Sequence, residues 1–366
     1  MNLTDVSVEI KNDYVLPLAK PEEVGMSSER LARIKPIMES YVDKAQVPGL
    51  LTAIVRYGKV VYFETHGYSD KEKKTPLDSS TIFRIYSMTK PVTAVAIMML
   101  YEMGYFFLDD PVSDHLPEFK NMKVLTEAGL VDAEQPITIS HLLTHTSGLT
   151  YSSVQTDPVK KDLYSAVKVD AVRRSDKVSL EQHVKDVSEL PLIAQPGTEW
   201  NYGESSTVLS RLIEVISGVS YGRFLKSEIF SPLSMRDTGF YVATEKSSLL
   251  AKLYSLDSDG RIIPADINDF GGDYRKPPFL EAGGAGLVST AADYLRFSQM
   301  LLNGGALEGK RILSPTTVKL MRQNHLGPQL GKMPLSTLQH PKTLKKGLGF
   351  GYSGSVVADP VENLTA

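Results

Sequence analysis

The chain has 366 residues, no cysteine and a formal net charge of −3, from 40 Lys and Arg against 43 Asp and Glu. This balance argues against nucleic acid as the main partner, because phosphate binding requires clustered positive charge. Without cysteine, disulfides, thiolate catalysis and sulfur-ligated zinc are excluded. The amino terminus lacks a basic region followed by an apolar run, and the most apolar stretch, 92–103, is too short to span a bilayer. We therefore expect a cytoplasmic protein without membrane contact, cofactor or metal.

The first third of the chain predicts a helix, a hairpin and a buried helix, in that order. Residues 27–44 place apolar side chains at helical spacing behind two serines that can cap a helix. In 49–68, two β-rich runs flank a turn at 57–59, which is typical of a hairpin. Residues 91–104 are apolar on nearly every face, as is expected of a helix in a core.

The middle of the chain, about 109–239, carries mostly helical patterns, and strand patterns return late. Residues 286–290 predict a short strand that leads into a helix over 291–302, and 347–357 is glycine-rich with β character. This order indicates one sheet assembled from both chain ends, with a helical domain inserted between them. We predict an α/β domain from 1–86 and 280–366 and a mainly helical domain from 87–279.

Ser87 and Lys90 form an S-x-x-K pattern at the start of the predicted buried helix. A serine hydroxyl is a weak nucleophile until a base takes its proton. Residues i and i+3 share a helix face, so Lys90 can reach the Ser87 oxygen. Pro91 places the pair in the first turn, where the helix dipole stabilises negative charge, and burial or a second cation would lower the pKa of Lys90 toward that of a base. Taken alone, the pattern also allows Ser87 to be only a helix cap.

Other matches to catalytic patterns have weaker surroundings. A second S-x-x-K at 165–168 lies in a charged segment and opens no buried helix. Residues 218–222 match the G-x-S-x-G nucleophile elbow, but a helix pattern precedes them where the elbow requires a strand. His141 and His145 have i, i+4 spacing without a third ligand and are interpreted as structural. The glycine-rich 283–286 lacks a lysine-bearing helix start, which favours close backbone packing over a phosphate loop.

The loop 196–204 carries a third candidate, Tyr202, just before the helix pattern of 206–217. A phenol at a loop-to-helix junction can point into a cleft and relay protons between a nucleophile and a leaving group. The alternative is that Tyr202 is one of 17 tyrosines, packed on Trp200, the only tryptophan of the chain. Taken by itself, the loop favours this second interpretation.

The order of the motifs along the chain is more specific than any one of them. Six blocks follow one another: FRIYSMTKP (83–91), LDDPV (108–112), ITISHLLTHTSGL (137–149), WNY (200–202), SPLSMRDT (231–238) and GGAGLVST (283–290). From about residue 20 to the end, this series resembles the serine β-lactamase-like superfamily, and most closely its family VIII carboxylesterases. The resemblance implies a β-lactamase/transpeptidase-like fold of the α/β plus all-α class. The resemblance further implies an antiparallel sheet flanked by helices, with the active site in the cleft between the α/β domain and the inserted helical domain.

The resemblance also implies an activity and the residues that perform it. The chain is expected to be a serine carboxylesterase that acts on short-chain or aromatic esters through an acyl-enzyme on Ser87. By motif match, Lys90 is the base partner, Tyr202 shares the proton transfer, and the Ser87 N–H supplies half of the oxyanion hole. Glu204 stands where penicillin-recognising members usually have asparagine; a carboxylate cannot donate that hydrogen bond, which favours esters over β-lactams. The expected partner is a small-molecule ester, and the oligomeric state stays open.

A third family element, Lys-Thr-Gly, His-x-Gly or Trp-Gly-Gly, is not found after Gly286, so the second oxyanion donor is unidentified. The family's last strands and C-terminal helix are not found either. We therefore expect this form to be poorly stable and weakly active, since one oxyanion donor is worth about 10²–10³ in rate. Three other functions stay open: a β-lactamase or D-Ala-D-Ala peptidase, an acyl transferase to an alcohol, and an inactive relative that acts as a binding module.

Overall fold

The computed structural model describes residues 16–154, 157–166, 177–267, 271–326, 347–352 and 354–358. The chain groups into two compact units. Unit 1 comprises Met1–Arg84, Phe230–Lys276 and Leu287–Asn303, and unit 2 comprises Ile85–Ile229, Pro277–Gly286 and Gly304–Ala366. These bounds differ from the division expected at residues 86 and 280, and the predicted domains stay a prediction.

Unit 1 contains an antiparallel sheet with the strand order β1-β2-β3. The turn between β1 and β2 has positive φ at Tyr57 (51°) and Gly58 (73°), the geometry that matches the twist of a tight hairpin. The predicted hairpin is thereby confirmed. The strands are β1 (Gly49–Arg56), β2 (Lys59–Asp70) and β3 (Thr75–Pro76).

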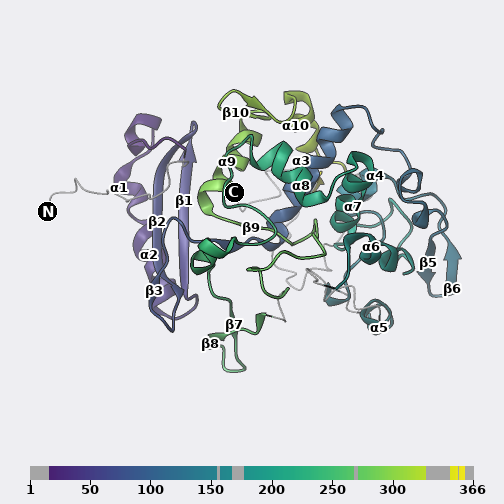
Figure 1. Cartoon of the computed structure of the whole chain (residues 1–366), viewed down its shortest axis with the longest axis horizontal. Helices are drawn as coiled ribbons and strands as arrows, with labels where there is room; N and C mark the ends of the chain where they lie inside the picture. Colours follow the sequence, from purple (N-terminus) through teal and green to yellow (C-terminus); the bar gives the residue numbers. More distant parts are fainter. Residues whose placement is uncertain are drawn as a thin grey trace. The chain divides into compact units, whose positions relative to one another are not determined.

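The predicted helix over 27–44 forms as two helices separated by a short break. Ser27 caps the first, because its side chain accepts a hydrogen bond from Arg30 N. Pro36 has no N–H to donate to the preceding turn, which accounts for the break at residues 32–33. The two are α1 (Ser28–Leu31) and α2 (Ile34–Asp43), preceded by the 3₁₀ turn η1 (Pro21–Val24), and α2 contacts β1 and β2 (Figure 1).

The early and late parts of the chain meet in unit 1 where β4 pairs antiparallel with β9, with Phe83 opposite Ser289. Thr290 ends β9 after two residues because its side chain caps the next helix, which spans 291–302 as predicted. Among the described residues, this pair does not join β1-β2-β3, so the single continuous sheet that we expected is not formed there. These elements are β4 (Phe83–Arg84), η8 (Thr244–Leu249), β7 (Tyr254–Leu256), β8 (Ile262–Pro264), β9 (Val288–Ser289) and α9 (Ala291–Leu302).

Unit 2 is mainly helical and is built around α3 (Thr89–Glu102), whose residues from Val92 to Leu100 are all buried. This confirms the predicted buried helix. Helix α7 (Ser205–Ser217) contacts α3, α4, α6 and α8 (Figure 1). The other helices are η2 (Tyr86–Met88), η3 (Val112–Asp114), η4 (Pro117–Phe119), α4 (Ile139–Leu143), η5 (Ser152–Val154), α5 (Pro158–Ala166), α6 (Leu180–Ser188), α8 (Tyr221–Leu225), the π-helical η7 (Lys226–Phe230, at the border with unit 1) and α10 (Pro315–Met321).

Three two-stranded antiparallel pairs complete unit 2. The last of them bears out the β character predicted for 347–357. Within the described ranges, no helix combines the length and the apolar character that crossing a bilayer requires. The pairs are β5 (Lys123–Thr126) with β6 (Gly129–Asp132), β10 (Ala306–Leu307) with β11 (Lys310–Arg311), and β12 (Leu348–Gly351) with β13 (Gly354–Val357).

The two patterns that we set aside as catalytic motifs lie in helical surroundings. Gly218 ends α7 with a φ of 72°, and Ser220 caps α8 by accepting from Arg223 N, so 218–222 is a helix–turn–helix junction, as predicted. Ser165 lies within α5, and its partner Lys168 lies outside the described residues.

Candidate active site

Ser87 and Lys90 lie where a 3₁₀ turn leads into the buried helix α3. Ser87 belongs to η2 and is exposed, whereas Lys90 belongs to the first turn of α3 and is only 5% exposed. Where the 3₁₀ turn continues into the α-helix, residues i and i+3 lie on the same face. Lys90 Nζ accordingly lies 3.3 Å from Ser87 Oγ. An accessible hydroxyl and a buried amine are thus within hydrogen-bond reach of each other.

Tyr202 reaches the same point from 115 residues further along the chain. Its hydroxyl is 2.6 Å from Ser87 Oγ. Lys90 Nζ also lies 4.6 Å from the centroid of the Tyr202 ring, a distance at which the π-electrons attract a cation. The structure therefore brings all three predicted site residues together, and all three belong to unit 2.

The loop that carries Tyr202 is held against the segment after α4. Asn201 N donates to His145 O at 2.7 Å. Gly203 packs so closely that a Cβ there would lie 2.3 Å from Thr150 Cα, which only glycine avoids. Two of the sequence blocks, 137–149 and 200–202, thus meet in space, and their contact sets the position of the Tyr202 phenol.

An aromatic cluster supports the Tyr202 ring. The ring stacks on Trp200, with centroids 6.0 Å apart, and lies 5.0 Å from the His145 ring. Phe350 of β12 contacts both His145 and Trp200. The predicted packing of Tyr202 on Trp200 is therefore observed, and its hydroxyl also lies at Ser87, while the proton relay stays a prediction.

His145 is a buried and neutral neighbour of this cluster. Burial and, to a smaller extent, the charge of Lys90 lower its pKa from 6.5 to about 3. Within the part of the chain that the structure describes, neither ring nitrogen has a hydrogen-bond partner. His141 has a different role: its Nδ1 accepts from Thr138 N at the start of α4. The side chains of both histidines therefore have local, structural surroundings.

Lys90 has a second partner that the sequence did not reveal. Its Nζ donates to Gly284 O at 2.6 Å. A Cβ at Gly284 would lie 2.9 Å from the Tyr151 hydroxyl and 3.7 Å from Lys90 Nζ. The glycine-rich block therefore shows the close packing that we predicted, and in addition it supplies a carbonyl acceptor. The only signal in the sequence was the glycine pair itself, and for Tyr151 there was none.

Glu204 lies in the interior, two residues after Tyr202. Its Oε2 is 3.4 Å from Nε2 of His183 on α6, and both side chains are buried. A carboxylate at this position accepts hydrogen bonds and donates none. Within the described ranges, Glu204 and His183 included, no three His, Asp or Glu side chains converge in a way that could hold a metal ion.

The arrangement provides the parts of a nucleophilic site. The N–H groups of the first turn of a helix have no partner within that helix, and the dipole places partial positive charge there. Ser87 lies in the 3₁₀ turn that leads into this end of α3, next to an amine and a phenol that can each accept or return a proton. Such a site can stabilise an oxyanion formed when Ser87 attacks a carbonyl carbon.

Comparison with known proteins gives the same superfamily for most of the chain. A family model described as Beta-lactamase matches residues 34–366. Protein Rv1367c of Mycobacterium tuberculosis is 35% identical over 326 residues, which is 88% of this chain and 78% of that protein. Esterase EstB of Burkholderia gladioli is 28% identical, over 90% of this chain and 80% of its own. The solved structure of EstCE1, described as a hydrolase with promiscuous acyltransferase activity, has a TM-score of 0.74 and 30% identity, and covers 92% of this chain and 84% of its own.

Proposed function

Because the chain belongs to the beta-lactamase family of serine hydrolases and has its fold, we propose that it hydrolyses short-chain or aromatic carboxylic esters through an acyl-enzyme on Ser87. The observation that carries this proposal is the convergence of Ser87 Oγ, Lys90 Nζ and the Tyr202 hydroxyl. Esterase relatives such as EstB support an ester as the substrate class.

The geometry suggests how the acyl-enzyme forms. Lys90, as the neutral amine, takes the proton of Ser87 while Oγ attacks the ester carbonyl carbon. The resulting oxyanion accepts from the Ser87 N–H at the positive end of the helix. The bond to the alcohol then breaks, Tyr202 gives its proton to the leaving oxygen, and Lys90 returns a proton to Tyr202. Water attacks the acyl-enzyme by the same steps in reverse order and releases the acid.

Glu204 favours esters over β-lactams within this proposal. Its carboxylate lies beside His183 in the interior, and it has no N–H to offer to a lactam amide. A β-lactamase or D-Ala-D-Ala peptidase is therefore the weaker alternative, and a comparison of substrates distinguishes it.

A second candidate is acyl transfer to an alcohol, and EstCE1 is the observation that favours it, because that hydrolase is described as having promiscuous acyltransferase activity. The acyl-enzyme is common to both reactions. An alcohol in place of water attacks the acyl carbon and gives its proton to the same bases. The bond to Ser87 Oγ then breaks, Oγ takes the proton back, and the new ester leaves. Ser87 and Met88 are exposed, which is compatible with either acceptor.

The test is hydrolysis of 4-nitrophenyl butyrate by the wild type and by Ser87→Ala, with Ser165→Ala as the matched S-x-x-K control. We expect Ser87→Ala to lose turnover and labelling by a fluorophosphonate, and Ser165→Ala to keep both. Mass spectrometry should place the fluorophosphonate adduct on Ser87. Faster turnover of a cephalosporin than of any ester would favour a β-lactamase, and a new ester formed in added alcohol would favour acyl transfer. Absence of any adduct on Ser87 would refute all three enzymatic functions.

A further inference from the structure

Thr93 lies one turn beyond Lys90 on α3 and is fully buried. Its Oγ1 is 2.7 Å from Gly283 O and 2.6 Å from the Tyr221 hydroxyl. A hydroxyl has one proton to donate, and a carbonyl oxygen only accepts. The arrangement that satisfies both short contacts has Tyr221 donating to Thr93 and Thr93 donating to Gly283 O. The catalytic helix is thus linked to the glycine loop, which we define as residues 281–286.

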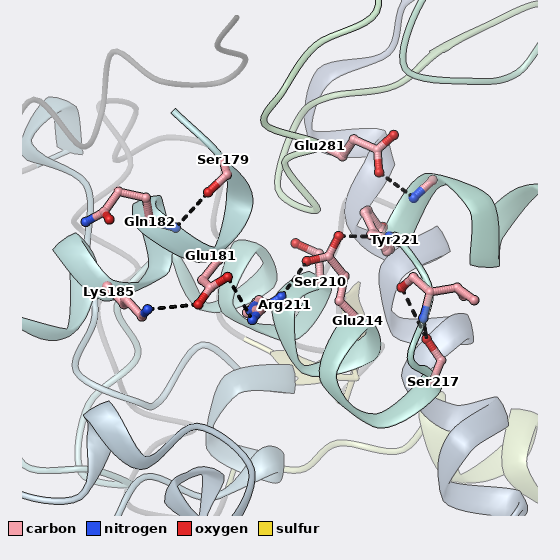
Figure 2. A network of polar contacts seen from close by, with 12 residues as sticks. Ser179, Glu181, Gln182, Lys185, Ser210, Arg211, Glu214, Ser217, Tyr221 and Glu281 are labelled. Carbon is pink, nitrogen blue, oxygen red and sulfur yellow. Dashed lines mark hydrogen bonds and ion pairs between the residues drawn. The ribbon is translucent and has the colours of Figure 1, made fainter. Parts of the chain in front are cut away.

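Tyr221 is suited to be a permanent donor. Burial raises the pKa of its hydroxyl above the ordinary value of 10, so the phenol keeps its proton throughout the working range of an enzyme. The residue lies in the first turn of α8, where Tyr221 N donates to Glu214 Oε1 at 3.1 Å (Figure 2). The side-chain donor therefore sits on a helix end whose own backbone is anchored to α7.

The glycine loop is attached to α8 and α7 at two further points. Gly222 N donates to Glu281 Oε2 at 2.6 Å, and Figure 2 shows Glu281 directed at the start of α8. Gly283 N donates to Ser210 Oγ at 3.3 Å. A Cβ at Gly283 would lie 2.5 Å from Ser206 O, so the loop backbone lies directly on α7. Both the N–H and the C=O of Gly283 are therefore held.

The held peptide immediately precedes the carbonyl that Lys90 uses. Because the peptide unit is planar, fixing the Gly283 carbonyl also fixes the N and Cα atoms of Gly284, so it anchors the residue whose carbonyl Lys90 contacts. In the structure that oxygen lies 2.6 Å from Lys90 Nζ. A carbonyl acceptor favours the ammonium form, whereas burial favours the neutral amine. The position of the Gly284 carbonyl thus affects both the orientation of the Lys90 side chain and how easily its amine accepts a proton.

We propose that Thr93 and Tyr221 are positioning residues, which hold the Gly284 carbonyl on Lys90 through Gly283 and so set the pH range in which Lys90 acts as a base. The inference rests on the role proposed for Lys90. Among the described residues, the titratable groups that face this amine include Tyr202, whose ring it contacts, and His145, whose pKa its charge lowers. The Tyr151 hydroxyl lies near Gly284.

The test compares Thr93→Val with Thr93→Ser. Valine keeps the shape but removes the hydroxyl, so the Gly283 carbonyl loses its donor and Gly284 O is held less firmly against the ammonium. We expect kcat/KM for 4-nitrophenyl butyrate to fall about tenfold, the rate equivalent of one well-placed hydrogen bond. The acidic limb of the kcat/KM profile should move to lower pH by about half a unit. Thr93→Ser keeps the hydroxyl and should therefore keep the kcat/KM and the acidic limb of the wild type. Tyr221→Phe should move the acidic limb to lower pH as well, but by less than Thr93→Val.

The matched control is Thr317→Val, which removes a buried hydroxyl on α10 whose partner is Ser314. It should leave the pH profile of the wild type unchanged. A profile unchanged in Thr93→Val and Tyr221→Phe would overturn the proposal even if both variants were less stable. If Thr93→Val does not fold, Tyr221→Phe decides alone.

A readout without turnover separates this inference from the proposed function. The ¹³Cε signal of Lys90, assigned by its loss in Lys90→Arg, reports the protonation of the amine directly. Its titration midpoint should be lower in Thr93→Val than in the wild type. A wild type without ester turnover but with this shift would refute the proposed function and keep the positioning role. Normal turnover without a shift would refute the positioning role alone.

Discussion

Asp293, in the first turn of α9, is expected to make unit 1 less stable as the pH rises. Its Oδ2 accepts from Asp237 N at 2.7 Å and from the Thr238 hydroxyl at 2.8 Å, while Oδ1 has no partner among the described residues. Burial is the main cause that raises its pKa from 3.8 to about 6. The charge of Asp237 acts in the same direction, and the two hydrogen bonds and Lys246 oppose it.

The size of the effect follows from the two pKa values. Between about pH 3.8 and 6 the folded protein keeps a proton that the unfolded chain has released, so the free energy of unfolding falls as the pH rises. Each pH unit is worth about 1.4 kcal/mol, and the group therefore costs up to about 3 kcal/mol at neutral pH. Asp293→Asn removes the titration and with it this slope. Asp293→Asn should gain less than about 3 kcal/mol of stability at neutral pH. Its amide N–H₂ group would take the place of Oδ1, which has no partner among the described residues, and would be a buried donor without an acceptor.

The assay is urea unfolding of the wild type and Asp293→Asn at several pH values from 4 to 8. We expect the variant to gain stability relative to the wild type as the pH rises to about 6, and the difference to be constant above that. Asp43→Asn, at the exposed end of α2, serves as the control and should follow the wild type. A difference between wild type and Asp293→Asn that does not change with pH would refute the reasoning, because it would mean that Asp293 titrates alike in both states.

Two further changes probe the candidate site. Tyr202→Phe keeps the ring on Trp200 but removes the oxygen 2.6 Å from Ser87 Oγ, so kcat/KM should fall about 10²–10⁴-fold with little change in the unfolding midpoint; a loss below tenfold would contradict a role in proton transfer. His145→Asn removes a group with a folded pKa of about 3, below its ordinary 6.5, so the wild type should lose stability toward acid by about 1.4 kcal/mol per pH unit in this interval. Asparagine tolerates the φ of 57° at this position. Urea unfolding at pH 4 and 7 measures the slope, and an equal slope in variant and wild type would exclude His145 as its source.

The features that the sequence predicted correctly depend on residues close together in the chain. The turn at Tyr57 and Gly58, the junction at 218–222 and the helix over 291–302 each follow from backbone preferences and caps within a few residues. The contact between Ser87 and Lys90 is of the same kind, because three residues of helical backbone suffice to bring the two side chains together. The order of the six blocks predicted the superfamily, and the family model that matches residues 34–366 confirms it.

Contacts across the unit depend on packing that no local pattern contains. The phenol of Tyr202 reaches Ser87 across 115 residues, and the Gly284 carbonyl reaches Lys90 across 194. The same holds for Thr93 and Tyr221, whose hydroxyls meet across 128 residues. The sequence alone determined which residues had the right chemistry and which of them were neighbours along a helix. Only the tertiary structure decided which distant groups surround the buried amine, because loops without a periodic pattern take their positions from the helices on which they pack.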